Sequence, residues 1–138
     1  MPYATAGDLR ARFQGERADD DEVDDLAGTG DARLTAALED ASAEIDSVIH
    51  DLYELPLPAG PWPLLRAIAC DVGRLRLYDD EAAERVLGAA SSARKKLRML
   101  AAGETALVDA NGQRAPRRRL VQATAPEPVM TREALADA

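Results

Sequence analysis

The sequence predicts an all-α fold, a bundle of three to four helices with a long acidic loop and an extended C-terminal arm. Three observations indicate this class. Apolar residues recur at spacings of three and four in three long segments, as on one face of a helix. Alanine and leucine dominate the hydrophobic fraction of 46%, while aromatic residues make up 4%, a composition that favours helices. No convincing strand is present, and the 138 residues suffice for one domain.

The first expected element is a short helix that begins after Thr5. Asp8 follows this cap by three residues, in the place of a capping-box acid. Leu9 and Phe13 are spaced i, i+4 on one face. Gly15 is a natural stop.

Residues 16–31 are acidic, end in glycines and predict a solvated loop. A calcium-binding loop would need glycine at its sixth position and glutamate at its twelfth. Counting from Asp19 places Asp24 sixth and Gly30 twelfth. We therefore expect no calcium site there.

The longest helix is expected after Asp31, a plausible N-cap. One apolar stripe repeats at spacings of 4, 3, 4, 3 and 4. Five acidic residues are expected to face away from it: Glu39, Asp40, Glu44, Asp46 and Asp51. A helix of about 20 residues spans ~30 Å and must bury its stripe against other elements. The stripe consists of Leu34, Leu38, Ala41, Ile45, Val48 and Leu52.

A proline-rich corner ends this helix. Four prolines between positions 56 and 63 forbid helical continuation, and each restricts the residue before it to extended conformations. We expect a stiff corner that turns the long helix back on the next one and is anchored by apolar side chains. Its residues are Tyr53, Leu55, Pro56, Leu57 and Pro58.

Two further helices are expected, over 61–78 and 81–102. The broad apolar arc of the first indicates the central helix of the bundle. Asp79-Asp80 are placed to cap the second, and Gly103 follows it as a C-terminal stop. The apolar positions are Leu65, Ile68, Val72 and Leu75, widened by Leu64, Ala69 and Tyr78, in the first, and Ala83, Val86, Ala90, Ala93, Leu97 and Leu100 in the second.

Residues 104–138 are expected to form a flexible C-terminal arm beside a helical domain of residues 1–103. The arm contains prolines and clustered arginines and lacks a hydrophobic period, which is typical of a segment that orders only on docking. Asn111-Gly112 is a hairpin signal with short flanks, which leaves a small hairpin and a plain loop both open. Thr131 is placed to cap a last helical turn.

Charge is distributed unevenly along the chain, whose net charge is −8. Residues 1–60 contain four arginines and fifteen acids, a net charge of −11, whereas residues 61–138 contain thirteen bases and ten acids, a net charge of +3. Such asymmetry is typical of electrostatic pairing between copies or with a partner, and equally of two solvated faces.

The chain lacks the residue patterns that catalysis or metal binding requires. Its one histidine, His50, has no cysteine or histidine at ligand spacing, and its one cysteine, Cys70, lies in an apolar run that predicts a core position. We expect no enzyme activity, no cofactor and no metal. Because no apolar run approaches the ~20 residues of a membrane span and no signal peptide is recognisable, we expect a soluble protein made in the cytoplasm.

Three blocks of sequence, in their order and spacing, resemble a family of small proteins of Mu-like phages and prophages. The blocks are YATAGDLRARF at 3–13, LEDASAEIDSVIHDLYELPL at 38–57 and LLRAIACDVGRLRLY at 64–78. The resemblance covers about residues 2–102. Members are encoded between capsid and tail genes, so the resemblance implies a head–tail connector, or adaptor.

The resemblance implies a structural role at the head–tail interface of the virion. Such an adaptor forms a ring, commonly a dodecamer, under the portal, and DNA passes through its centre without sequence-specific binding. Its partners are further copies of itself, the portal protein and a tail-completion or stopper protein. By analogy with adaptors that dock through a C-terminal extension, the portal-docking residues would be Arg114, Arg117, Arg118, Arg119, Leu120 and Val121.

Two other functions stay open. A small DNA-binding protein would use the basic clusters 94–98 and 114–119 to neutralise phosphates, although aromatic residues for base stacking are absent near them. A regulatory, antitoxin-like protein would fold its arginine-rich tail on a partner. Duplex affinity across salt concentrations tests the first alternative, and gene neighbourhood tests the second.

Overall fold

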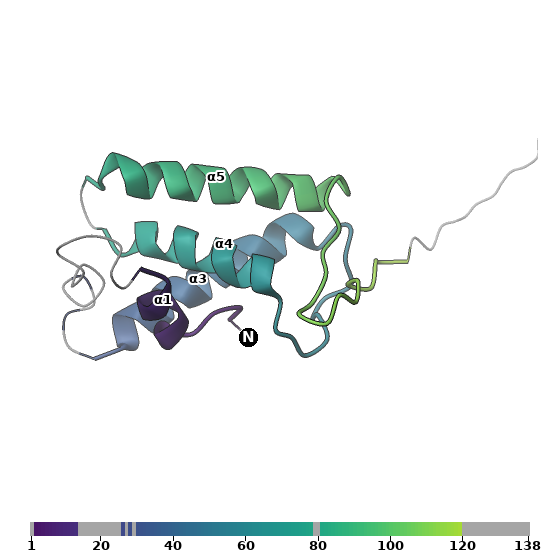
Figure 1. The fold of residues 1–138 in the computed structure, drawn as a ribbon, viewed down its shortest axis with the longest axis horizontal. Helices are drawn as coiled ribbons and strands as arrows, with labels where there is room; N and C mark the ends of the chain where they lie inside the picture. The colour runs from purple at the N-terminus through teal and green to yellow at the C-terminus, as the bar shows by residue number, and fades with distance from the viewer. Residues whose placement is uncertain (1, 14–25, 27, 29, 79–80, 120–138) are drawn as a thin grey trace, which may run out of the picture.

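The computed structural model describes residues 2–13, 26, 28, 30–78 and 81–119. Over these residues the chain is all-α, as predicted: four helices form a bundle, and the only β structure is two isolated bridges. The helices are α1 (Ala6–Phe13), α3 (Ala32–Ile49), α4 (Pro63–Arg76) and α5 (Glu84–Ala101). α4 lies in the middle and packs against the other three (Figure 1), so the prediction of its central place is confirmed.

α1 begins with the predicted capping box. The Thr5 backbone N–H donates to Asp8 Oδ2 at 2.9 Å, and the Asp8 N–H donates to Thr5 Oγ1 at 3.1 Å, so each side chain satisfies a backbone donor. Leu9 and Phe13 are buried, as predicted. The guanidinium carbon of buried Arg74 lies 4.0 Å from the centroid of the Phe13 ring, and this cation–π contact joins α1 to α4.

α3 buries most of the predicted apolar stripe, but the end of the stripe shifts. Val48 and Leu52 are only half-buried, and Ile49 is buried instead. A spacing of four from Ile45 continues the 3.6-residue period, and the helix ends at Ile49, so Leu52 falls on the turn that follows. Asp31 occupies the N-cap, although its side chain makes no capping hydrogen bond. The positions predicted correctly are Leu34, Leu38, Ala41 and Ile45.

α4 is two residues shorter at each end than predicted and starts at Pro63, with buried Trp62 as its N-cap. Proline suits the first turn because its missing N–H would be unpaired there. Gly73 faces α3, and a Cβ on it would lie 3.0 Å from Leu38 Cδ2, so this glycine lets the two helices approach closely. Of the predicted positions, Leu65, Ile68, Ala69 and Val72 are buried, and Leu64, Leu75 and Tyr78 are half-buried.

α5 begins at Glu84, three residues later than predicted, and its N-cap is Ala83. The placement of Ala83 in the helical seam is therefore wrong, because this residue precedes the helix. Gly103 has a φ of +80° and follows the C-cap Ala102, as the predicted stop requires. The remaining seam is confirmed and buried: Val86, Ala90, Ala93, Leu97 and Leu100.

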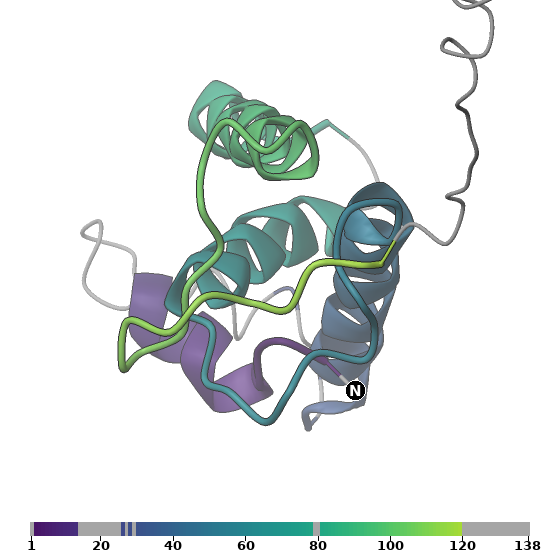
Figure 2. The same cartoon turned by 90° about the vertical axis from the view of Figure 1, so that its right-hand side faces the viewer.

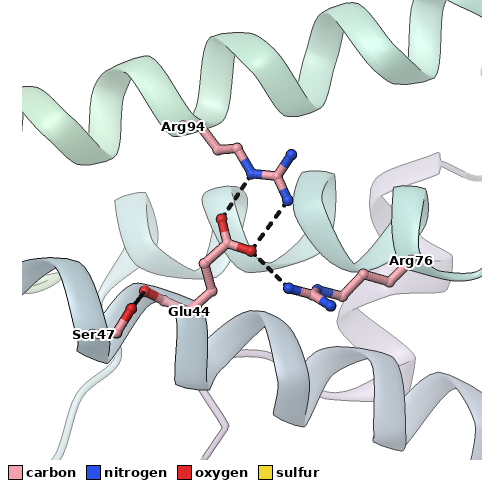
Figure 3. Close-up of polar contacts among 4 residues, drawn as sticks. All are labelled: Glu44, Ser47, Arg76 and Arg94. Atoms are coloured by element: carbon pink, nitrogen blue, oxygen red, sulfur yellow. Dashed lines mark hydrogen bonds and ion pairs between the residues drawn. The ribbon is translucent and has the colours of Figure 1, made fainter.

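One carboxylate connects three helices (Figure 3). Glu44 of α3 accepts two hydrogen bonds from Arg94 of α5, at 2.7 and 3.1 Å, and one from Arg76 of α4, at 2.8 Å. The bonds from Arg94 hold the pKa of Glu44 below its ordinary value, although partial burial opposes them. Glu44 thus lies on the flank of α3 that meets α5, and its predicted place on the solvent face is wrong.

Some expectations fall on residues outside the described ranges. They are most of the acidic loop of 16–31, the Asp79-Asp80 cap, the docking residues Leu120 and Val121, and the turn at Thr131. Among the helices that the structure describes, none has the length and apolar character needed to cross a membrane.

Candidate docking surface at the proline corner

The proline corner, residues 53–62, turns the chain from α3 to α4 at one end of the bundle (Figure 1). Tyr53 is buried, and Leu55 and Leu57 are half-buried against the core. Pro56 and Pro58 are exposed. The apolar side chains of the corner therefore point inward while its prolines face solvent, which combines an anchor with an accessible surface.

Trp62 closes the corner from the α4 side. Its indole N–H donates to the Pro58 carbonyl at 3.0 Å, and the ring is buried. A Cβ on Gly60 would lie 2.8 Å from the indole, closer than packed atoms allow. A glycine is therefore needed where the corner passes the tryptophan.

The segment after α5, residues 104–119, lies across this end of the bundle, and we call it the strap. It runs from the C-terminus of α5 to that of α3 (Figure 2). The Glu54 N–H donates to the Pro116 carbonyl at 3.0 Å, and the Arg118 N–H donates to the Leu52 carbonyl at 2.8 Å. Leu107, within the strap, is buried. The first part of the predicted arm is thus folded against the corner, which the sequence did not indicate.

A tight turn reverses the strap at its middle. Val108 and Arg114 form an isolated antiparallel bridge, so the hairpin alternative holds in this minimal form. The Gly112 N–H donates to the Asp109 carbonyl at 3.0 Å, and Asp109 Oδ1 accepts from the Asn111 N–H at 2.9 Å. Gly112, with a φ of +83°, therefore ends the turn rather than standing at its centre beside Asn111, because the Asp109 side chain organises the loop.

The predicted docking arginines that the structure describes all belong to the strap. The side chain of Arg118 also reaches the end of α3, where its Nη1 donates to the His50 carbonyl at 3.2 Å. A cation there complements the partial negative charge of the helix C-terminus. The strap thereby gathers exposed positive charge beside the corner, on Arg114, Arg117, Arg118 and Arg119.

A groove of about 290 Å³ lies beside the corner, between the N-terminal segment, α3 and residues 56–62. The Tyr3 hydroxyl donates to Asp46 Oδ1, and burial, with help from this bond, raises the pKa of Tyr3. The Tyr3 N–H also donates to Ser42 Oγ at 2.9 Å. These bonds hold the N-terminal segment on α3 as one wall of the groove. The other wall is formed by residues 56–62 of the corner. Such a concave surface can receive a side chain of a partner.

The nucleophile and metal-ligand candidates are placed as core or surface residues. Burial raises the pKa of the Cys70 thiol to about 12, so it is protonated and unreactive near neutrality. His50 is exposed at the end of α3, and its Nδ1 lies 3.4 Å from Asp51 Oδ1. Within the described ranges no three His, Cys, Asp or Glu side chains cluster as metal ligands would.

Comparison with known protein families shows which family the chain resembles. A family model described as "Bacteriophage Mu, Gp36" matches residues 3–125. The match includes all four helices, the proline corner and the strap. A search of curated proteins finds no significant match.

Proposed function

This chain belongs to the Bacteriophage Mu Gp36 family, and from that membership we propose that it is a structural protein of the virion, the connector between head and tail. The observation that carries the proposal is the family match over residues 3–125. The connector forms a ring under the portal, DNA passes through the ring, and a tail-completion or stopper protein binds its other side.

The strap and the proline corner are the portal-docking surface in this proposal. The arginines of the strap are exposed and offer charge to an acidic partner, and the neighbouring groove offers an apolar contact. Interfaces commonly combine a concave apolar centre with a charged rim. Leu120 and Val121 follow the last described residue of the strap and would extend the contact.

The corner supplies rigidity for this contact. Pro56 and Pro58 limit the conformations of the unfolded chain, so alanine at either position should lower the free energy of unfolding, by about 0.4–1 kcal/mol at Pro58. We expect the double variant to form fewer rings on portal. Rings that form as efficiently as those of the original protein would contradict this role.

The proposed function is exercised by contact rather than by catalysis. Two observations support this view: the one thiol is buried and protonated, and the one imidazole lies exposed at a helix end. Among the described residues, the pKa of the Glu44 carboxylate is lowered, and this group is bound by two arginines that fix helix packing.

Three experiments test the proposal. Cryo-electron microscopy of virions should place the chain between portal and tail, and phage lacking it should accumulate unjoined heads and tails. Portal binding should weaken several-fold in Arg117→Glu and stay unchanged in Arg66→Glu, an exposed arginine on α4 that serves as control. Absence of the chain from virions would refute the proposal.

The exposed arginines keep DNA binding as a second candidate. Tight duplex binding that weakens steeply with salt would favour it, and Arg117→Glu would then lower DNA affinity instead of portal affinity.

A further inference from the structure

α3 and α5 each present an outward helix face that no other described part of the chain covers, and the two faces carry opposite charge. We propose that these faces bind one another between neighbouring copies, so that the acidic face of one copy meets the basic face of the next. This inference rests on the proposed connector function, because it names the lateral contact of the ring.

The acidic face lies on the outer side of α3. Its exposed residues recur at helical spacing and include Glu39 and Asp40. No lysine or arginine occurs between Arg33 and Arg66 in the sequence. Within the described ranges the side chains of Glu39 and Asp40 make no hydrogen bond or ion pair. The carboxylate of Glu44, on the flank of the same helix, is bound by two arginines. The face consists of Ala36, Glu39, Asp40, Ala43 and Ser47.

The basic face lies on the outer side of the C-terminal half of α5. Lys95, Lys96 and Arg98 are exposed, and none of their side chains has a hydrogen bond or an ion pair within the described residues. Arg94, one position before them, turns inward to Glu44 instead. Before this cluster the exposed residues of α5 are small: a glycine at position 88 and serines at positions 91 and 92. Leu87 beside them is 47% exposed. This half of α5 thus offers unpaired cations next to a smooth, partly apolar surface.

A second copy fits these faces better than another partner for two reasons. The faces belong to two different helices, and α3 and α5 lie at different places around α4 (Figure 2). One copy can therefore use both faces at once, as a closed heterologous ring requires. The chain has a net charge of −8, so copies repel one another unless opposite charges meet locally. Small side chains on both faces permit the close approach of packed helices.

Charge reversal tests the contact without a need to know its register. We choose Glu39→Lys/Asp40→Lys for the acidic face and Lys95→Glu/Arg98→Glu for the basic face. Self-association is measured by sedimentation velocity at about 50 mM and about 500 mM salt, since exposed pairs are screened as salt rises. The controls are Glu81→Lys/Glu104→Lys and Arg66→Glu/Arg114→Glu, which change the net charge equally at exposed positions on neither face.

Each face variant alone should self-associate at least about tenfold more weakly than the original chain, because two attractive pairs become repulsive. An equimolar mixture of the two face variants should recover association, since every reversed face then meets its complement. The control variants should associate as the original chain does, and high salt should weaken every association.

Three outcomes would overturn the inference: an original chain that stays monomeric at low salt, a mixture that does not recover, or controls that lose association as much as the face variants. A basic-face variant that loses only duplex DNA binding would also overturn it and would assign that face to nucleic acid. The test distinguishes failure of the lateral contact from failure of the connector role. If virions hold the chain at the junction but the mixture does not recover self-association, the lateral contact alone is refuted. Recovery by a chain absent from virions would refute the connector role alone.

Discussion

Leu107→Ala tests whether the strap is held by one buried side chain. Leu107 is 1% exposed, and the other buried residue of the strap, Ala115, has little surface to contribute. Leucine-to-alanine changes in cores cost about 2–5 kcal/mol, and a surface segment relaxes easily, so we take the lower value, about 2 kcal/mol. Since 1.4 kcal/mol is a factor of ten, the open state of the strap should become about 30-fold more populated.

Trypsin reads out this opening, because it cleaves after the strap arginines only when the backbone pairs with residues 52 and 54 are broken. When opening and closing are fast, cleavage tracks the population of the open state, so the initial cleavage rate after Arg117 should rise about 30-fold. Val108→Ala is the matched control: Val108 is adjacent but 38% exposed, and a surface change of this kind costs less than about 0.5 kcal/mol. Equal cleavage rates in the two variants would refute the reasoning that Leu107 anchors the strap.

Three further predictions concern the corner and the helices. The Tyr53 hydroxyl is buried without a hydrogen-bond partner among the described residues, so Tyr53→Phe should raise the free energy of unfolding by about 1 kcal/mol in urea titrations; a loss would show that this hydroxyl is satisfied. Gly88→Ala should stabilise α5 by about 0.8–1 kcal/mol, because a Cβ there meets nothing within 4 Å. Gly73→Ala should be neutral or destabilising, because its Cβ would crowd α3. A higher melting temperature for Gly73→Ala than for Gly88→Ala would contradict this packing. Glu44→Gln should lower the free energy of unfolding by about 1 kcal/mol near pH 7. Because folding lowers the pKa of Glu44, its stabilising contribution is complete above the unfolded value of 4.5 and is lost as the pH falls through the lower folded value. The stabilities of the two proteins should therefore converge in acid, and a difference that stays constant with pH would argue against this ion cluster.

Local rules predicted α1 and the helical seams because their causes are local. The Thr5–Asp8 box needs only residues three apart, and a seam follows from the 3.6-residue period of the helix it occupies. The errors in the predicted seams lie at helix ends. Ile49 is buried in place of Val48, and Ala83 precedes its helix, because the outermost buried position depends on where the helix begins or ends. Tertiary contacts decide where the helix begins and ends.

The strap and the Glu44 cluster could not be predicted in the same way. The strap docks through backbone hydrogen bonds and the isolated apolar residues Leu107 and Ala115, which form no period that a sequence pattern could reveal. Glu44 lies on the flank of α3 between seam and solvent, where the identity of the packed neighbour decides its role. The signal available in advance was weak: Leu107 and Ala115 lie symmetrically about Asn111, as partners across a turn would.

The proposed contacts with portal and with neighbouring copies use different elements, and this separation makes their failures distinguishable. The proposed portal surface belongs to the strap, which we expect Leu107 to anchor, whereas the proposed lateral faces lie on α3 and α5. Strap opening in Leu107→Ala should therefore weaken portal binding while self-association persists. Reversal of Lys95 and Arg98 should weaken self-association while the trypsin sensitivity of the strap stays unchanged. Were one variant to change both properties, the strap would have to carry lateral contacts as well, because Gly103 joins it directly to the end of α5.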